Sequence, residues 1–482
     1  MLRVNQHERR ASGADSPRDR TRGGRGGGRR GGRDGGRGPR PTVDPARWAA
    51  YEAVGAVHRD DAYANLVLPR ILAHYDVHGR DAAFTTELTY GTLRLLGTLD
   101  AVIAHAAERA VDRIDPPARD ALRLGAYQLL RMRVPAHAAV STTVDLVRAV
   151  APGAAGFANA VLRKIGSRDW DGWTAALAPA DEVERLGLAH AHPPWVVRAF
   201  AEALGESPVE PALAADNVAA TVHLCARPGR ITAAALAERT GGEVGRYGPF
   251  AVYLPSGAPG EVPALAQGLA HVQDEGSQLV ANALVDAPLD GPDERWLDLC
   301  AGPGGKAALL GALAAVRGAR VTAVEVAPHR AALVEKATRG LPVEVRADDG
   351  REIEGTFDRV LVDAPCTGLG ALRRRPEARW RRQPSDLPPL TKLQRELLGA
   401  ALRVVRPGGL VAYVTCSPHV AETRVTVTET CRRSAVECDF VDVRPYLPAG
   451  MPELGGGPTV QLWPHRHGTD AMFVALLRRS AQ

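Results

Sequence analysis

The stretch Trp296–Val326, WLDLCAGPGGKAALLGALAAVRGARVTAVEV, decides the fold of this chain. It reads as an apolar strand, a glycine-rich turn, a helix and a second apolar strand. The alternation continues downstream, with strand candidates at 357–364 and 409–416 and helix candidates between them. Strands that alternate with helices predict a doubly wound, mostly parallel α/β sheet over residues 291–482. Ligands of such sheets bind beyond the carboxyl ends of the strands, so functional residues are expected there.

The sequence before this domain divides into two further folded parts. Residues 42–168 place apolar residues, mainly Ala and Leu, at steps of three and four, which predicts an all-helical domain. Residues 169–290 begin as a linker and continue as a small α/β adaptor. Its strand candidates at 221–228 and 250–255 flank a helix candidate at 231–241.

The first 41 residues differ in composition from the rest of the chain. The 482 residues are 45% hydrophobic and 24% charged, as is typical of folded proteins, but residues 18–40 hold 9 Arg and 10 Gly. Residues 1–40 carry 12 Arg and 4 acidic residues, so the net charge of +5 comes from this end. Because such a segment cannot bury a core, we predict a disordered tail over 1–41. It is either an arm that holds RNA phosphates or a solubilising extension, unless the start codon lies further downstream.

Composition also excludes several classes of protein. No run of about 18 apolar residues predicts a transmembrane helix, and the N-terminus lacks the apolar region of a secretory signal. The six cysteines form neither a disulfide framework nor a CxxC metal pair. We therefore expect a cytoplasmic protein without a metal site.

Three successive strand ends indicate a cofactor site. The glycine-rich turn allows close backbone approach, and the helix after it offers unpaired N–H groups to an anion. The turn is not GxGxxG, which favours the carboxylate of an amino-acid-bearing nucleoside over a pyrophosphate. Glu325 ends the second strand, where it is placed to bind two ribose hydroxyls, and Asp349 follows the third, near an adenine amino group. These groups suit S-adenosylmethionine.

Two cysteines follow the ends of the next two strands. Cys366 lies in the sequence DAPC, and Cys416 lies in VTCS. A lone strand cysteine usually serves as a small apolar residue, but two thiols beside a cofactor site favour chemistry. Carbon 5 of a pyrimidine becomes nucleophilic once a thiolate adds to carbon 6. Asp363 is placed to stabilise that adduct near ring nitrogen N3, and Lys306 is expected to help form the thiolate.

A basic and aromatic segment follows Cys366. Arginines surround one tryptophan, which suits phosphate contact together with base stacking, although a solvated surface loop would also explain the charge. Since the target base must be unstacked to reach the thiols, a single-stranded RNA loop is the expected substrate. The candidate RNA-binding residues are Arg373, Arg374, Arg375, Arg379, Trp380, Arg381 and Arg382.

The motifs DLCAGPGGK, VQDEGSQ, DAPCTG and VTCS together resemble the RNA cytosine-5 methyltransferases of the Fmu/Sun/NOL group. The resemblance implies a Rossmann-like methyltransferase domain in which Cys416 is the nucleophile and Cys366 assists release of the adduct. It also implies that S-adenosylmethionine contacts Cys300, Ala301, Gly302, Pro303, Gly304, Gly305, Lys306, Glu325, Asp349 and Asp363.

The helical segments ELTYGTLR, LRLGAYQLL, PAHAAV and GFANAVLRK look like a NusB-like RNA-binding domain. That combination is similar to the RsmB branch, which methylates one cytosine in the helix 31 loop of 16S rRNA. Two residues depart from the family pattern at the cofactor site. Gly302 stands where Ala is usual, with no expected effect, and Glu325 replaces the commoner Asp, which lengthens the ribose contact. Three other segments also depart from the family pattern, namely AHPPW, CARPGR and TDAMF. Whether these segments contact RNA is therefore left open.

We therefore expect a monomeric 16S rRNA cytosine-5 methyltransferase. A tRNA or 23S rRNA target is an alternative, and so is a non-catalytic NusB-like RNA-binding factor. A small-molecule methyltransferase is disfavoured by the helical domain and the arginine-rich segment. The sequence leaves open the exact nucleotide, whether naked RNA or an assembling subunit is the substrate, and the role of the tail.

Overall fold

Seven helices form the first part of the chain, as the apolar periodicity predicts. The computed structural model describes residues 43–255 and 259–481, so the tail expected over 1–41 lies outside the described residues. Side chains such as Leu99, Ile103 and Leu122 are fully buried in the core of this part. The helices are α1 (Pro45–Arg59), α2 (Ala64–His74), α3 (Gly79–Arg94), α4 (Leu96–Ala107), α5 (Pro116–Arg131), α6 (Ala136–Val150) and α7 (Ala155–Ile165).

The expected linker at the start of 169–290 is helical in the structure. Asp169 and Asp181 cap the helices that follow them, because each carboxylate accepts a backbone N–H of the first turn. Trp170 and Trp173 pack into the core of the helical domain, which explains why this segment is ordered. The helices are α8 (Trp170–Ala176), α9 (Glu182–Ala189), α10 (Pro194–Leu204) and α11 (Glu210–Ala215).

The adaptor contains a four-stranded antiparallel sheet in the order β2-β3-β1-β4. Its two predicted strands and the helix between them are present. Leu224, Leu236 and Val252 form the centre of its small core. The elements are β1 (Val222–Ala226), α12 (Ala233–Thr240), β2 (Glu243–Val244), β3 (Ala251–Leu254), α13 (Pro263–Ala266) and β4 (Ala270–Val272).

The last part holds an eight-stranded mixed sheet in the order β10-β12-β9-β8-β5-β6-β7, with β11 paired to β12. Strands β5 to β9 are parallel, whereas β12 runs antiparallel to β9 and β10, so the predicted mostly parallel sheet is confirmed. Its strands are β5 (Arg295–Asp298), β6 (Arg320–Val324), β7 (Val343–Arg346), β8 (Phe357–Asp363), β9 (Val405–Thr415), β10 (Cys438–Val441), β11 (Val460–Gln461) and β12 (Phe473–Arg479).

Helices cover both faces of this sheet. Alternate residues of one strand separate the two cores: Leu361 packs with α14 and α15, and its neighbour Val362 packs with α18. Helix α14 lies within the expected adaptor range but packs on the large sheet, so the methyltransferase part begins before residue 291. The helices are α14 (Glu275–Asp286), α15 (Gly305–Arg317), α16 (Pro328–Ala337), α17 (Ala378–Arg381), α18 (Leu387–Val404), α19 (Arg424–Arg433) and α20 (Pro464–His467).

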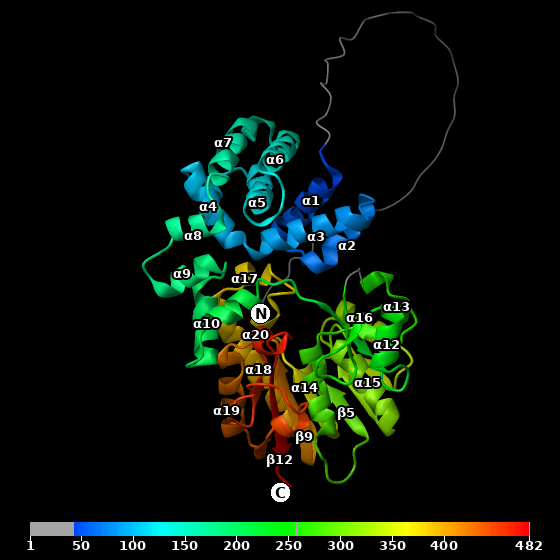
Figure 1. Cartoon of the computed structure of the whole chain (residues 1–482). Coiled ribbons are helices and arrows are strands. Elements are labelled where there is room, and N and C mark those ends of the chain that lie inside the picture. Colours follow the sequence, from blue (N-terminus) through cyan, green and yellow to red (C-terminus); the bar gives the residue numbers. More distant parts are fainter. Residues whose placement is uncertain (1–42, 256–258, 482) are drawn as a thin grey trace, which may run out of the picture. The chain divides into compact units, whose positions relative to one another are not determined.

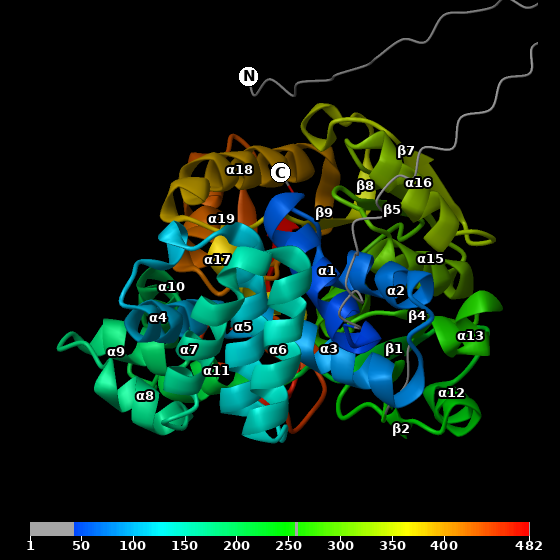
Figure 2. The same ribbon diagram turned by 90° about the horizontal axis from the view of Figure 1, so that it is seen from above.

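Contacts join the described residues, 43–255 and 259–481, into one unit. Helices α1 to α7 gather at one end of it, next to the short helix α17 of the last part (Figures 1 and 2). Within the described ranges, none of the helices has the length and apolar character needed to traverse a bilayer.

Candidate active site at the strand ends

The glycine-rich turn between β5 and α15 is held by one carboxylate. Oε2 of Glu325 accepts a hydrogen bond of 3.1 Å from the backbone N–H of Gly302. Arg330 contacts both residues, because its guanidinium donates to the carbonyl of Gly302 at 2.7 Å and to Oε1 of Glu325 at 3.3 Å. Glu325 is only 3% exposed. Glu325 therefore lies beside the glycine-rich turn, just after β6.

Three features of this site fit S-adenosylmethionine. Gly304 has φ +112°, and a Cβ atom there would lie 2.8 Å from Cβ of Ala337. Only glycine therefore allows the backbone of the turn to lie this close to α16. The start of α15 directs its unpaired backbone N–H groups to the same place. Asp298, at the end of β5, is fully buried with neither carboxylate oxygen hydrogen-bonded, and burial together with Asp363 raises its pKa to about 7. A cationic amino group would satisfy that carboxyl.

The two predicted thiols lie side by side. The distance between Sγ of Cys366 and Sγ of Cys416 is 3.5 Å, and both residues are partly exposed. The hydrogen bond from Cys366 lowers the pKa of the Cys416 thiol against the effect of burial, with help from the charges of Lys306 and Arg375. The same hydrogen bond and burial raise the pKa of Cys366. Cys416 is thus the thiol that favours the nucleophilic thiolate.

Lys306 and Asp363 form an ion pair beside the thiols. Nζ of Lys306 lies 2.8 Å from Oδ2 of Asp363, and their side chains are 10% and 27% exposed. Burial opposes the charge of Lys306, but the attraction of Asp363 prevails and raises the pKa of the lysine. The ammonium group therefore stays charged next to Cys416.

Glu422 is a site residue that the sequence reasoning missed. Its buried carboxylate accepts hydrogen bonds from the backbone N–H of Thr367 at 2.8 Å, from the Thr367 hydroxyl, from Ser417 at 2.6 Å and from Gln394 at 3.1 Å. Thr367 follows Cys366, and Ser417 follows Cys416. One carboxylate therefore holds both cysteine loops in register. The acidic residue six positions after Cys416 was the available sequence signal.

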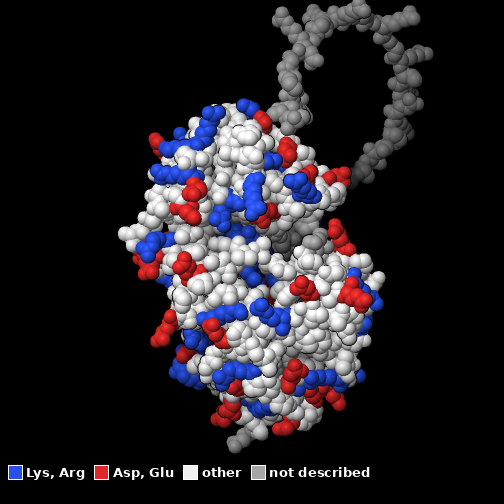
Figure 3. All heavy atoms as spheres, viewed as in Figure 1, with Lys and Arg blue, Asp and Glu red and all other residues white. Residues whose placement is uncertain are grey.

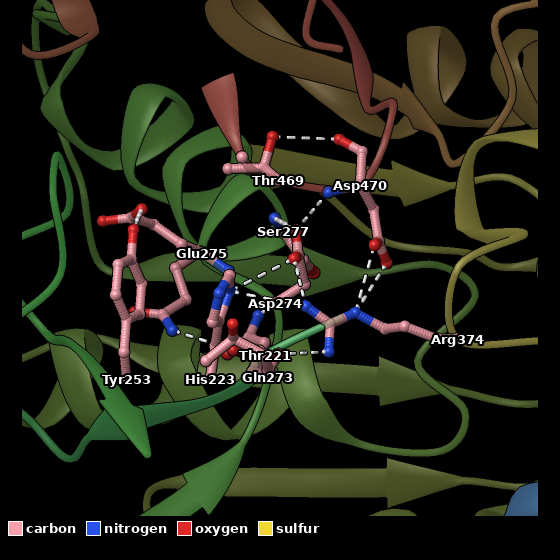
Figure 4. Close-up of polar contacts among 12 residues, drawn as sticks. Thr221, His223, Tyr253, Gln273, Asp274, Glu275, Ser277, Arg374, Thr469 and Asp470 are labelled. Atoms are coloured by element: carbon pink, nitrogen blue, oxygen red, sulfur yellow. Dashed lines mark hydrogen bonds and ion pairs between the residues drawn. The ribbon is translucent and has the colours of Figure 1, made fainter. Parts of the chain in front are cut away.

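Arg374 was expected to bind RNA, but it joins three segments of the protein (Figure 4). Its guanidinium lies 2.7 Å from Asp274 and 3.0 Å from Asp470, and it donates to the carbonyl of Thr221 at 2.9 Å. Despite burial, these carboxylates raise the pKa of Arg374. The arginine thus fixes the adaptor against the strand ends instead of facing solvent.

Arg379 corrects the expectation that its segment faces RNA. It is fully buried, and its guanidinium donates to the carbonyls of Arg94 (3.2 Å), Ala191 (2.9 Å) and Asp216 (3.2 Å). A guanidinium enclosed by carbonyls has no face left for a phosphate.

The residues on either side of Arg379 also contact the helical domain. Trp380 donates to the carbonyl of Leu93 at 2.9 Å. Arg381 donates to the carbonyls of Val57, Asp61 and Ala62. These side chains connect the helical domain to the methyltransferase part.

The remaining predicted residues lie in different surroundings. Arg373 is buried, and its guanidinium donates to the carbonyl of Gly468 at 3.0 Å. Arg382 donates to the carbonyl of Thr367 at 3.1 Å, and Arg375 is exposed. Asp349 follows β7 and pairs with Arg351, which lowers its pKa against a small effect of burial.

Comparison with known proteins matches both halves of the chain. A family model for the 16S rRNA methyltransferases RsmB/F matches residues 281–478, and the NusB family model matches residues 44–167. The chain is 60% identical over 448 residues to Rv1407 of Mycobacterium tuberculosis, a protein named as a methyltransferase, over 91% of this chain and 98% of that protein. It is 33% identical to ribosomal RNA small subunit methyltransferase B of Pseudomonas putida, over 90% of this chain and 98% of the relative.

Solved structures share the same fold. The structure of PH0851 superposes with a TM-score of 0.75 at 24% identity and covers 90% of this chain and 99% of that chain. A methyltransferase homologue from Pyrococcus horikoshii gives a TM-score of 0.51 at 22% identity, over 62% of this chain and 99% of that chain. At these identities the likeness concerns the fold alone.

Proposed function

Because the chain belongs to the RsmB/F family of 16S rRNA methyltransferases, we propose that it methylates carbon 5 of one cytosine in the helix 31 loop of 16S rRNA. Family membership makes the chain an S-adenosylmethionine-dependent RNA cytosine-5 methyltransferase. The single observation that carries the proposed chemistry is the 3.5 Å separation of the Cys366 and Cys416 sulfurs beside the glycine-rich turn.

The reaction begins at Cys416. Its thiolate adds to carbon 6 of the cytosine, and the electron pair of the carbon 5–carbon 6 double bond makes carbon 5 nucleophilic. At the ordinary cysteine pKa of about 8.5, only about 3% of a thiol is ionised at pH 7. The hydrogen bond from Cys366 and the nearby charges of Lys306 and Arg375 lower the pKa of Cys416. A larger fraction of this thiol is therefore ionised at pH 7.

Asp363 and Lys306 act on the ring of the adduct. The Asp363–Lys306 ion pair lies at the end of β8, and Asp363 is the group we assign to hydrogen-bond ring nitrogen N3. When bound, S-adenosylmethionine supplies an electrophilic methyl group beside carbon 5. Glu325, the glycine-rich turn and Asp298 are the groups that would hold it there.

The last step restores the aromatic ring. The proton on carbon 5 must leave before the bond between Sγ of Cys416 and carbon 6 can break, and its electron pair then re-forms the double bond. We assign the acceptance of this proton to Cys366, because its sulfur lies next to that of Cys416. Cys366 must reach this step as a thiolate, having given its own proton to water, and it passes the proton taken from carbon 5 to water before the next turnover. After release, Cys416 is a thiolate again and the enzyme is ready for another cytosine.

An RNA substrate agrees with the surface of the protein. On the face drawn in Figure 3, Lys and Arg side chains lie over the helical domain and along its border with the methyltransferase part, interspersed with acidic side chains. Such a surface attracts phosphates without regard to sequence. The choice of 16S rRNA rests on the description of the family model and on relatives that are about one-third identical and are named ribosomal RNA small subunit methyltransferase B.

The deciding experiment is bisulfite mapping of 5-methylcytosine in all rRNA and tRNA from cells with and without this gene. Loss of one cytosine signal in the 16S helix 31 loop is the expected result. A signal lost only from tRNA or 23S rRNA would overturn the 16S assignment and leave the chemistry standing. Complementation with Cys416→Ala tests the non-catalytic alternative, since a binding factor would restore its function without the thiol.

A further inference from the structure

Tyr63 is an aromatic side chain of the helical domain that lies beside the arginines of the methyltransferase part. It immediately precedes α2 and is 45% exposed. The guanidinium carbons of Arg375 and Arg381 each lie 5.6 Å from the centre of its ring. This places one partly exposed aromatic ring beside two cations, and aromatic rings combined with arginines are typical of surfaces on which nucleic-acid bases stack.

The two arginines differ in what else they contact. Arg381 is bound to the carbonyls of Val57, Asp61 and Ala62, so it fixes the turn that leads to Tyr63. Arg375 is exposed, and no described residue forms an ion pair or side-chain hydrogen bond with its guanidinium. The position of the ring is thus fixed by Arg381, while Arg375 keeps its donors for another partner.

This surface is continuous with the active site. We call residues 370–382 the arginine loop. The backbone N–H of Gly370 donates to the carbonyl of Cys416 at 2.8 Å, and Arg382 donates to the carbonyl of Thr367 at 3.1 Å. Both ends of the loop are therefore attached to the two cysteine loops. After the hydrogen bond from Cys366, the charge of Arg375 is among the influences that lower the pKa of Cys416.

We propose that Tyr63 and Arg375 together bind the nucleotide next to the target cytosine, the ring stacking on its base and the guanidinium contacting its phosphate. The proposal rests on the proposed function, because it supplies a contact for the RNA that the active site modifies. Turning the target cytosine out of the stack exposes one face of the neighbouring base. An aromatic ring can stack on the exposed face of any of the four bases. An arginine can bind the phosphate through two N–H donors.

The proposal gives the helical domain a direct part in substrate binding at the active site. Glu377 is the acidic residue nearest in sequence to both arginines, and Asp61 is the acidic residue of the helical domain that contacts Arg381. Glu377 is buried, and Asp61 lies 4.0 Å from Arg381. Neither carboxylate pairs with Arg375 in the structure, so its charge is not neutralised before RNA arrives.

The test uses the full-length enzyme and the RNA that it methylates in the mapping experiment. Methyl transfer is measured with Tyr63→Ala, Tyr63→Phe and Arg375→Ala, and KM is determined separately for RNA and for S-adenosylmethionine. Leu66→Ala is the matched control, because Leu66 is 60% exposed and lies about one turn after Tyr63, in α2. Thermal melting of each variant checks its folding.

We expect Tyr63→Ala and Arg375→Ala each to raise KM for RNA about tenfold, in keeping with the size of single stacking and phosphate contacts. KM for S-adenosylmethionine should stay the same, and the loss should be smaller for Tyr63→Phe, which keeps the ring. Arg375→Ala should also reduce the slope of log binding constant against log salt by about 0.7.

Two outcomes would overturn the inference in different ways. A wild-type enzyme that methylates RNA, with Tyr63→Ala and Arg375→Ala within twofold of its KM, removes the proposed contact and leaves the function intact. A wild-type enzyme that methylates no RNA removes the proposed function, and the contact with it.

Discussion

Gly302 and Glu325 fit together as a pair: the backbone N–H of Gly302 donates to Oε2 of Glu325 at 3.1 Å, and a Cβ atom at Gly302 would overlap that same oxygen. These are the two positions at which the cofactor site departs from the family pattern. This overlap argues against the expectation that glycine has no effect. The longer side chain of Glu325 occupies the space that an alanine methyl group at position 302 would need, so the two residues fit each other.

The pair predicts that Gly302→Ala weakens cofactor binding. The added methyl group must displace Glu325 from the ribose position, so we expect Kd for S-adenosylmethionine to rise at least tenfold by calorimetry. The double variant Gly302→Ala with Glu325→Asp restores the family pattern and should recover most of the affinity. A single Gly302→Ala variant that binds as tightly as wild type would show that the turn yields to the methyl group.

The paired thiols predict opposite behaviour for their two alanine variants. Cys416→Ala should abolish methylation and form no adduct, because no thiolate adds to carbon 6. Cys366→Ala keeps the nucleophile but loses help with release, so a covalent protein–RNA complex should accumulate on denaturing gels. Adding Cys416→Ala to the Cys366 variant should abolish that complex. Turnover by Cys366→Ala at the wild-type rate would contradict the division of labour.

Lys306 predicts a pH dependence for the nucleophile. After the hydrogen bond from Cys366, its charge is one of the influences that lower the pKa of Cys416, so Lys306→Met should raise that pKa. The thiolate would then form at higher pH. When the rate of alkylation of Cys416 by iodoacetamide is plotted against pH, the midpoint of the curve should shift upward by about one pH unit. Mass spectrometry of the modified peptide follows this directly. Lys392→Met is the control. The side chain of Lys392 is 75% exposed and pairs with Glu396, so this variant should give the wild-type profile.

Arg379 predicts a cost in stability that an exposed arginine would not show. Arg379→Met leaves three buried carbonyls without their donor, at about 1–3 kcal/mol each before the structure relaxes. It also removes the main group that opposes the effect of burial on Asp216, whose pKa stands at about 7. We expect the free energy of unfolding in urea to fall by about 2–4 kcal/mol. Arg433→Met, at a side chain 68% exposed, should stay within about 0.5 kcal/mol of wild type.

The sequence could predict the strand ends because short-range patterns determine them. Apolar runs separated by helices specify the order of β5, β6, β8 and β9, and parallel neighbours bring their carboxyl ends to one edge. Two cysteines placed just after neighbouring strands of this kind are therefore expected to lie close together. Glu325 and the glycine-rich turn followed from the same rule.

The environment of the arginine loop could not be predicted in this way. Charge in a loop normally faces water, and the sequence around Arg379 carries no sign that its partners are carbonyls of Arg94 and Ala191, far away in the chain. Burial of a charged side chain against distant backbone is decided by how the domains pack. The helices in 169–195 were not predicted for a similar reason. Trp170 and Trp173 pack into the core of the helical domain, but the sequence around them shows no clear helical periodicity.

Glu422 gives the sharpest test of how the two cysteine loops are positioned. All four groups around its carboxylate donate hydrogen bonds, so Glu422→Gln places an amide NH2 against donors and breaks the arrangement without changing its size. A small misplacement of reacting groups can cost about a hundredfold in rate, and we expect a fall of that order in kcat. KM for S-adenosylmethionine should not change, because Glu422 does not lie at the glycine-rich turn.

The same variant separates positioning from mere stability through the pKa of Cys366. The charge of Glu422 contributes to raising that pKa, after the hydrogen bond to Cys416 and burial. Removing the charge should therefore let Cys366 ionise at lower pH, which alkylation of the Cys416→Ala background can measure without interference from the second thiol. Glu437→Gln, at an exposed glutamate, is the matched control. If Glu422→Gln lowered the melting temperature but left kcat and the Cys366 profile at their wild-type values, the carboxylate would support the fold and not the geometry of the thiols.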